Sequence, residues 1–102
     1  MTIYIDIDDT ICKTSGTDYS EAVPIPEAIK KSNSLYDDGH TIVYWTARGT
    51  VTGIDWRDLT ESQFESWGVK YHHLKFGKPA YDLFIDDKNI SAKEWLEDNK
   101  KY

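Results

Sequence analysis

The sequence predicts an α/β protein built on a small parallel sheet, and two observations lead to this prediction. Short, β-branched apolar runs alternate along the chain with longer segments of helical periodicity. Each of the main apolar runs is followed directly by polar residues. Strands that alternate with helices form right-handed βαβ units, and helices cover both faces of the resulting sheet. We therefore expect a compact three-layer sandwich formed by residues 1–102 as one domain.

Turn and capping residues define the expected elements. Pro26 suits the first position of a helix that ends near Gly39, and a second helix begins at about Asp58 and stops at Gly68. Ser91 with a glutamate three residues later has the pattern of a capping box, which predicts a closing helix. The expected strands are Ile3–Ile7, His40–Trp45, Val69–Leu74 and Asp82–Ile85.

Composition excludes several classes of function. Twelve basic and eighteen acidic side chains give a net charge of −6, which argues against non-specific binding of nucleic acid or a membrane surface. Hydrophobic residues make up 39% of the chain and aromatic residues 14%, as in a packed domain. The single Cys12 cannot form an internal disulfide, and no signal peptide or membrane-spanning run is visible. We expect a cytoplasmic protein.

Polar side chains follow three of the four expected strands. Asp6 and Asp8 lie at the end of the first, Thr46 follows the second, and Asp86 with Asp87 follow the fourth. The carboxyl ends of parallel strands meet at one edge of a sheet, where ligands bind. The sequence therefore predicts a site at this edge, which the loop containing a lysine, Lys78, can also reach.

These residue types suit phosphoryl transfer assisted by a metal. Oxygen ligands without His or Cys favour Mg²⁺, which Asp6 and Asp86 from two strands could hold. Thr46, the neighbouring backbone N–H of Ala47 and Lys78 would bind the phosphoryl oxygens. One carboxylate could attack phosphorus, and another could protonate the leaving group and later activate water.

At this point the chain resembles a known family. Asp6-Ile7-Asp8-Asp9-Thr10, Thr46, Lys78 and Asp86-Asp87, in this order, resemble the four motifs of the haloacid dehalogenase (HAD) superfamily. The resemblance implies a Rossmann-like fold, with Asp6 as the nucleophile and Asp8 as the general acid/base. It further implies that Thr46 and Lys78 bind phosphate, and that Mg²⁺ is held by Asp6, the backbone carbonyl of Asp8, and Asp86 with Asp87.

A narrower likeness concerns the substrate. The segments Trp45-Thr46-Ala47-Arg48-Gly49, Gly77-Lys78-Pro79 and Leu83-Phe84-Ile85-Asp86-Asp87-Lys88 look like those of small bacterial and phage proteins related to phosphatases of capsular-polysaccharide and sugar-phosphate pathways. This likeness implies a phosphomonoesterase acting on a sugar phosphate or a related small metabolite.

Spacing indicates that no cap domain is present. The intervals Asp8–Thr46 and Thr46–Lys78 are already filled by the expected loops, helices and strands, so the site should be open. An uncapped site and abundant aromatic residues also favour self-association, and the sequence leaves the oligomeric state open.

Two assignments keep an alternative. Lys75 competes with Lys78 as the phosphate-binding lysine, although Gly77 and Pro79 favour Lys78. Arg48 follows the phosphate loop and either reaches a second anionic group on the substrate or pairs with an acidic residue of the protein. Trp56, in an irregular loop near Arg57, is a candidate for lining the substrate entrance. Asp9 has no role beyond stabilising the turn.

Two other functions compete with the phosphatase. A receiver domain also uses Asp, Thr and Lys on a parallel sheet, but its acceptor Asp lies on a middle strand, and the corresponding strand here has none. A non-catalytic module that binds a metal or a sugar phosphate is the second alternative. The presence of Asp8 argues against such a module, because a binder needs no acid/base.

Overall fold

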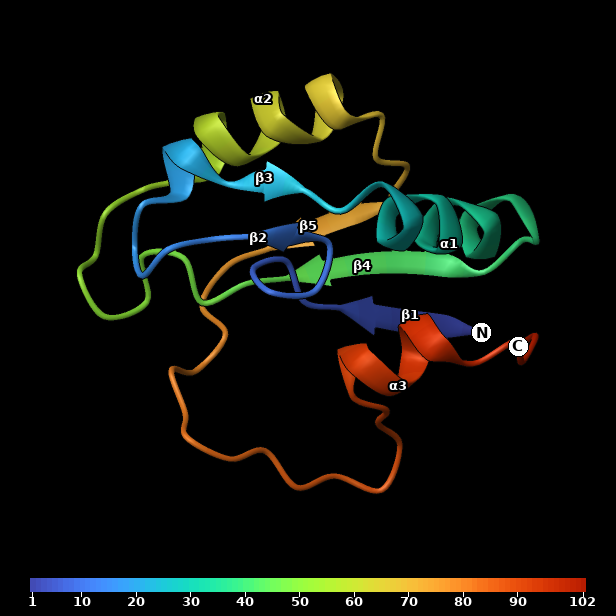
Figure 1. Ribbon diagram of the computed structural model, residues 1–102. Coiled ribbons are helices and arrows are strands. Elements are labelled where there is room, and N and C mark those ends of the chain that lie inside the picture. Colours follow the sequence, from blue (N-terminus) through green and yellow to red (C-terminus); the bar gives the residue numbers. More distant parts are fainter.

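The computed structural model describes all residues, 1–102. Three parallel strands form the main sheet: β1 (Thr2–Ile5), β4 (Thr41–Trp45) and β5 (His73–Lys75), in the order β1-β4-β5 (Figure 1). The central strand β4 pairs with β1 from Thr2↔Thr41 to Ile5↔Tyr44. The prediction of a small parallel sheet is therefore confirmed.

The helices also lie where the sequence predicts them. Helix α1 (Pro26–Asp37) begins at its proline, and α2 (Arg57–Trp67) ends at Gly68, which adopts a left-handed conformation (φ 70°). Helix α3 (Ala92–Glu97) is capped by Ser91, whose side chain accepts a hydrogen bond from the Glu94 backbone N–H. Local capping signals thus determined where these helices begin and end.

The loop expected after β1 forms a small hairpin. Strand β2 (Cys12–Lys13) pairs antiparallel with β3 (Val23–Pro24), and a short 3₁₀ helix, η1 (Tyr19–Glu21), lies between them. We call residues 14–22 the flap.

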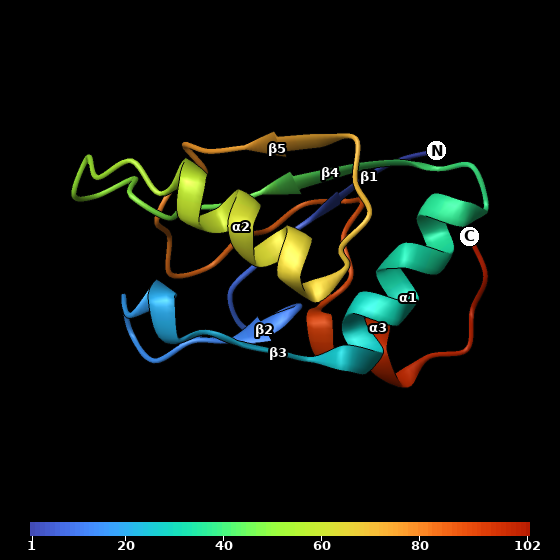
Figure 2. The same cartoon turned by 90° about the horizontal axis from the view of Figure 1, so that it is seen from above.

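The helices cover one face of the sheet. Figure 2 shows the three strands on one side of the molecule and α1, α2, α3 and the hairpin on the other. Ile5, Ile42 and Tyr44 point into the core between these layers, whereas Tyr4 on the opposite face is 53% exposed. The expected layer of helices on the second face is absent, so the three-layer sandwich is observed as two layers.

The fourth strand is the clearest error of the sequence prediction. Asp82–Ile85 is irregular in the structure, and the side chains of Leu83 and Ile85 are 75% and 88% exposed. The chain is held at the carboxyl edge of the sheet because the Lys78 backbone N–H donates to the Thr46 carbonyl at 3.1 Å. Only Pro79, Ala80 and Tyr81 separate Lys78 from the segment, which leaves no chain for a turn on the way back to the amino end of β1. A favourable local pattern therefore does not become a strand.

None of the three helices has the length and apolar character needed to cross a membrane.

Candidate active site

The turn after β1 places two carboxylates at the carboxyl end of the sheet. Ile7 is fully buried, and its carbonyl accepts hydrogen bonds from the Thr10 and Ile11 N–H groups, which forces the chain to turn. Asp9 takes the left-handed conformation that this turn requires (φ 60°), and its N–H donates to the Cys12 carbonyl. The structure thus gives Asp9 a place in the turn, in line with the turn-stabilising role expected for it.

Asp6 lies beside Lys78. The Lys78 Nζ is 3.5 Å from Asp6 Oδ2, and Asp6 Oδ1 accepts a hydrogen bond from the Ile7 N–H at 2.9 Å. Burial raises the pKa of the Asp6 carboxyl above its ordinary value, and Lys78 opposes this shift. By contrast, Lys75 lies away from both carboxylates, with its Nζ 3.3 Å from the Tyr4 hydroxyl. Of the two competing lysines, the structure brings Lys78 to Asp6.

A small pocket opens at this pair. It has a volume of about 150 Å³ and is lined by Asp6, Ala47, Lys78, Pro79, Ala80 and Tyr81. Lys78 Nζ lies 5.3 Å from the centre of the Tyr81 ring and 5.9 Å from that of Trp45, so both rings are within cation–π distance of the ammonium group. The pocket joins the end of β1, the loop after β4 and the loop after β5.

The loop after β4 is held in place by backbone hydrogen bonds. Thr46 is 1% exposed, its N–H donates to the Lys75 carbonyl, and its carbonyl accepts from the Lys78 N–H. The Thr46 hydroxyl oxygen also accepts a hydrogen bond from the Arg48 N–H at 3.1 Å. These contacts place Ala47 at the pocket that contains Asp6, whereas Thr46 itself does not line that pocket.

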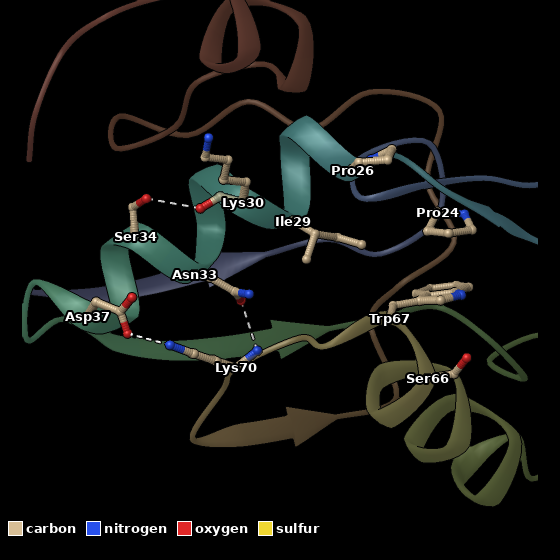
Figure 3. A pocket seen from close by; sticks show the side chains of 10 residues that line it. All are labelled: Pro24, Pro26, Ile29, Lys30, Asn33, Ser34, Asp37, Ser66, Trp67 and Lys70. Atoms are coloured by element: carbon tan, nitrogen blue, oxygen red, sulfur yellow. Dashed lines mark hydrogen bonds and ion pairs between the residues drawn. The ribbon is translucent and has the colours of Figure 1, made fainter.

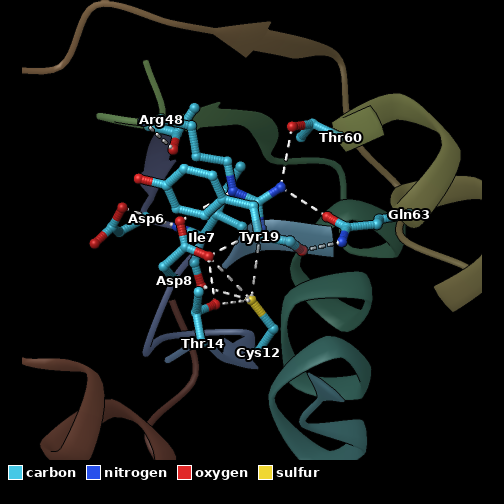
Figure 4. A network of polar contacts seen from close by, with 10 residues as sticks. Asp6, Ile7, Asp8, Cys12, Thr14, Tyr19, Arg48, Thr60 and Gln63 are labelled. Carbon is cyan, nitrogen blue, oxygen red and sulfur yellow. Dashed lines mark hydrogen bonds and ion pairs between the residues drawn. The ribbon is translucent and has the colours of Figure 1, made fainter. Parts of the chain in front are cut away.

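Asp8 is paired with a buried arginine (Figure 4). Arg48 Nε donates to Asp8 Oδ2 at 3.0 Å, and Nη2 donates to Asp8 Oδ1 at 2.9 Å. The Thr14 hydroxyl donates to the same Oδ1 at 2.6 Å. Burial acts to raise the pKa of the Asp8 carboxyl, but the hydrogen bonds from Arg48 and Thr14 outweigh it, and the pKa lies below its ordinary value.

All the donors of Arg48 are used within the protein. Its Nη1 donates to Thr60 Oγ1 at 3.0 Å and to Gln63 Oε1 at 2.7 Å, and its Nη2 also approaches Cys12 Sγ at 4.0 Å. A guanidinium has five N–H groups, so none is left to bind a substrate anion. With 2% of the residue exposed, the structure favours an internal ion pair for Arg48 over a contact with substrate.

The same network holds the flap. The Tyr19 ring lies 4.9 Å from the Arg48 guanidinium carbon, and Gln63 Nε2 donates to the Tyr19 carbonyl at 2.6 Å. Trp56 packs edge-to-face on Tyr19 with ring centres 5.1 Å apart. Trp56 is partly buried against the flap and does not line the pocket that contains Asp6.

Sequence reasoning missed four residues of this network: Thr14, Tyr19, Thr60 and Gln63. A usable signal exists only for Thr60 and Gln63. They are polar residues three positions apart on the same face of α2 as the buried Phe64, and a polar pair on a core-facing surface requires a buried partner.

Cys12 shows no sign of reactivity. It is fully buried, and burial raises the pKa of its thiol to about 11. The interpretation of Cys12 as a small core residue rather than a nucleophile therefore fits the structure.

The expected metal ligands are not gathered within one chain. Asp86 and Asp87 lie on the irregular segment and are exposed, and Asp86 Oδ1 accepts a hydrogen bond from the Asp87 N–H. No group of three or more acidic, His or Cys side chains that could hold a metal ion occurs in the structure. As they lie in a single chain, these residues do not fit a Mg²⁺ ion, which needs several converging oxygen ligands.

A second, larger pocket lies away from the carboxylates. Its volume is about 600 Å³, and it is a shallow space between α1 and the end of α2 (Figure 3). An ion pair between Lys70 Nζ and Asp37 Oδ1, 2.8 Å long, crosses it, and Trp67 forms part of its wall. None of its lining residues belongs to the site at Asp6.

Comparison with known proteins supports the fold only. No family model and no curated protein matches the chain. One similar solved structure is the crystal structure of an MCSG target from Vibrio cholerae, with a TM-score of 0.87 and 23% sequence identity over 97% of this chain and 90% of that one.

Proposed function

We propose that this protein is a phosphomonoesterase of the haloacid dehalogenase type, with Asp6 as the nucleophile. One observation carries the proposal: a carboxylate and an ammonium group, Asp6 and Lys78, share a small pocket with Ala47. A phosphoryl group in this pocket would have its oxygens beside Lys78 and its phosphorus within reach of Asp6. The order of the motifs in the sequence independently supports the same chemistry.

The proposed reaction has two steps. The Asp6 carboxylate forms a bond to phosphorus while the ester P–O bond breaks, and the departing alcohol oxygen takes a proton from protonated Asp8. A water molecule then attacks phosphorus, gives a proton to Asp8 and releases phosphate, which regenerates Asp6. Arg48 keeps Asp8 ionised, so Asp8 is ready to accept that proton. The same ion pair disfavours the protonated form of Asp8, which is the form that donates a proton to the leaving group.

The proposed substrate is a sugar phosphate or a related small metabolite. Hairpin, helices and strands fill the chain between the site residues, and no inserted domain covers the pocket. The end of β1, the loop between β4 and α2, and the loop after β5 border it. An open pocket of this kind accepts esters whose organic part extends into solvent.

Mg²⁺ is part of the proposal as the cofactor, on the strength of the acidic motifs. It would neutralise the charge of the phosphoryl group. Asp6 is the one proposed ligand that the structure places in the pocket, and the carboxylates of Asp86 and Asp87 must come from elsewhere.

Hydrolysis of an aryl phosphate by the purified protein with Mg²⁺ tests the proposal. We expect release of phosphate in the wild type and none in Asp6→Asn. Asp8→Asn should slow turnover by about 10²- to 10⁴-fold while binding of a phosphate analogue persists. Asp38→Asn, at the exposed end of α1, is the matched control and should match the wild type. Unchanged turnover in Asp6→Asn would refute the assignment of the nucleophile, and analogue binding without any turnover would favour the binding module.

A further inference from the structure

The chain exposes two surfaces that fit each other. Strand β1 pairs with β4 on one side only, so its other edge presents unpaired backbone groups. The irregular segment between Lys78 and Ser91 carries a run of apolar side chains in solvent, which are Tyr81, Leu83, Phe84, Ile85 and Ile90, exposed between 42% and 88%. Exposed apolar runs of this kind mark interaction sites on soluble proteins.

The segment has the pattern of a strand that would complete the sheet. Leu83 and Ile85 are two positions apart and would fall on one face, next to the core residue Ile5 of β1. In a parallel arrangement Asp86 would then stand at the carboxyl end, beside Asp6. The two groups of acidic residues that the proposed metal requires would meet there.

The segment cannot easily reach β1 of its own chain. Lys78 is held at the carboxyl edge through its N–H and its contact with Asp6. The four residues from Lys78 to Asp82 span at most about 14 Å, and a strand of four residues is itself about 13 Å long. A straight run back would use the whole connection and leave no chain for a turn. Parallel neighbours normally need a connection of a dozen or more residues.

We propose that two copies of this chain exchange the segment Asp82–Asp87, each placing it against β1 of the other. A reciprocal exchange is closed, because the same two surfaces are used by both copies. Three of the five apolar side chains lie in the exchanged segment, and Tyr81 and Ile90 flank it. Removing all five of each copy from water buries on the order of 1,000 Å², the minimum expected of a specific interface.

For the site, the exchange makes Asp86 of one copy a neighbour of Asp6 of the other. This part rests on the proposed phosphatase function, whereas the exchange itself does not. Each active site would then be composite, and a single chain would hold only half of it.

The first test is the mass in solution, which needs no activity. We expect twice the chain mass at micromolar concentration and the chain mass for Ile85→Asp, because a carboxylate would enter the core of the partner. Val51→Asp is the matched control: Val51 is 81% exposed on another loop, and its variant should remain a dimer. A monomeric wild type, or a dimer that Ile85→Asp leaves intact, would overturn the exchange.

The second test is complementation between inactive variants. Asp6→Asn and Asp86→Asn, co-expressed with two affinity tags and purified as the mixed dimer, restore one intact site of two. We expect about half the wild-type activity for the mixed dimer and none for either variant alone. An inactive mixed dimer beside an active wild type overturns the composite site and leaves the phosphatase standing. An inactive wild type refutes the phosphatase, and the mass measurements then decide the exchange.

Discussion

Replacing Arg48 by methionine should destabilise the protein strongly. The side chain of Arg48 is fully buried, whereas that of Asp8 is 23% exposed. Removing one partner of a buried ion pair costs about 3–5 kcal/mol, because the other charge is left without compensation. Asp8 can regain some water, so we expect the lower end, about 3 kcal/mol. Thr60 and Gln63 would lose a hydrogen-bond partner in the same variant.

The measurement is urea unfolding followed by tryptophan fluorescence. A loss of about 3 kcal/mol should appear as a lower midpoint with an unchanged slope. The control is Arg57→Met at the start of α2: Arg57 is 46% exposed, and its ion pair with Glu61 is a surface pair at 3.3 Å. Its other contacts are a hydrogen bond to the Leu74 carbonyl and the ring of Phe76. Such pairs contribute about 0.3–0.5 kcal/mol, so Arg57→Met should cost far less than Arg48→Met.

A milder variant keeps the prediction testable if Arg48→Met does not fold. Thr60→Val removes one acceptor of Arg48 with little change in shape, and we expect a cost of about 1 kcal/mol. If Arg48→Met costs under about 1 kcal/mol, no more than a single neutral hydrogen bond, the guanidinium does not compensate Asp8, and our account of the network is refuted.

Three further predictions follow from the same structure. The pKa of Asp8 is lowered in the folded state, so its ion pair stabilises the protein fully at pH values above the unfolded-state pKa near 3.8, and this stabilisation is lost as the pH falls through the folded-state pKa. The difference in unfolding free energy between wild type and Asp8→Asn should therefore shrink in acid. A difference that is constant with pH would contradict the lowered pKa. Gly49→Ala should be at least about 1 kcal/mol less stable than Gly53→Ala. Both glycines have a positive φ, but only at Gly49 would an added Cβ clash with the Ile54 carbonyl oxygen. Equal unfolding midpoints in urea would refute this prediction. Cys12, with a thiol pKa of about 11 against an ordinary 9.0, should be alkylated at pH 8 about 100-fold more slowly in the folded protein than in guanidinium, as mass spectrometry can measure, and equal rates would show that the thiol is accessible.

The helices and the first two strands could be predicted because their signals are local. Pro26, Gly68 and Ser91 act on the backbone within a few residues, and the β-branched runs of β1 and β4 are buried in the sheet they form. Asp82–Ile85 has an equally good local pattern and fails as a strand within the chain. Whether this segment pairs as a strand depends on the length of the connection from Lys78 and on the contacts that anchor Lys78, and a local sequence pattern predicts neither.

The candidate site shows the same division. The positions of Asp6, Asp8 and Thr46 at the ends of strands follow from topology alone. The buried environment of Arg48 does not, because it depends on which face α2 turns toward the β1 turn. For this reason the sequence alone is compatible with both roles of Arg48, and its occupied donors in the structure favour the internal ion pair.

The environments of Asp6 and Asp8 separate their roles. Asp8 has a full counter-charge in Arg48 and a lowered pKa, whereas Asp6 has only Lys78 at 3.5 Å, and burial raises its pKa. Two carboxylates whose environments push their pKa values apart are typical of sites in which each has a different task. Asp6 is therefore the carboxylate that still lacks positive charge, and a cation held jointly with Asp86 of a second copy would supply it.

For the same reason, Asp6→Asn should raise the thermal midpoint of the protein at neutral pH, because the variant removes a poorly compensated charge. This gain should vanish in acid, where Asp6 is protonated in both the folded and the unfolded state. A lower midpoint for Asp6→Asn at neutral pH would show that Lys78 alone already compensates the carboxylate.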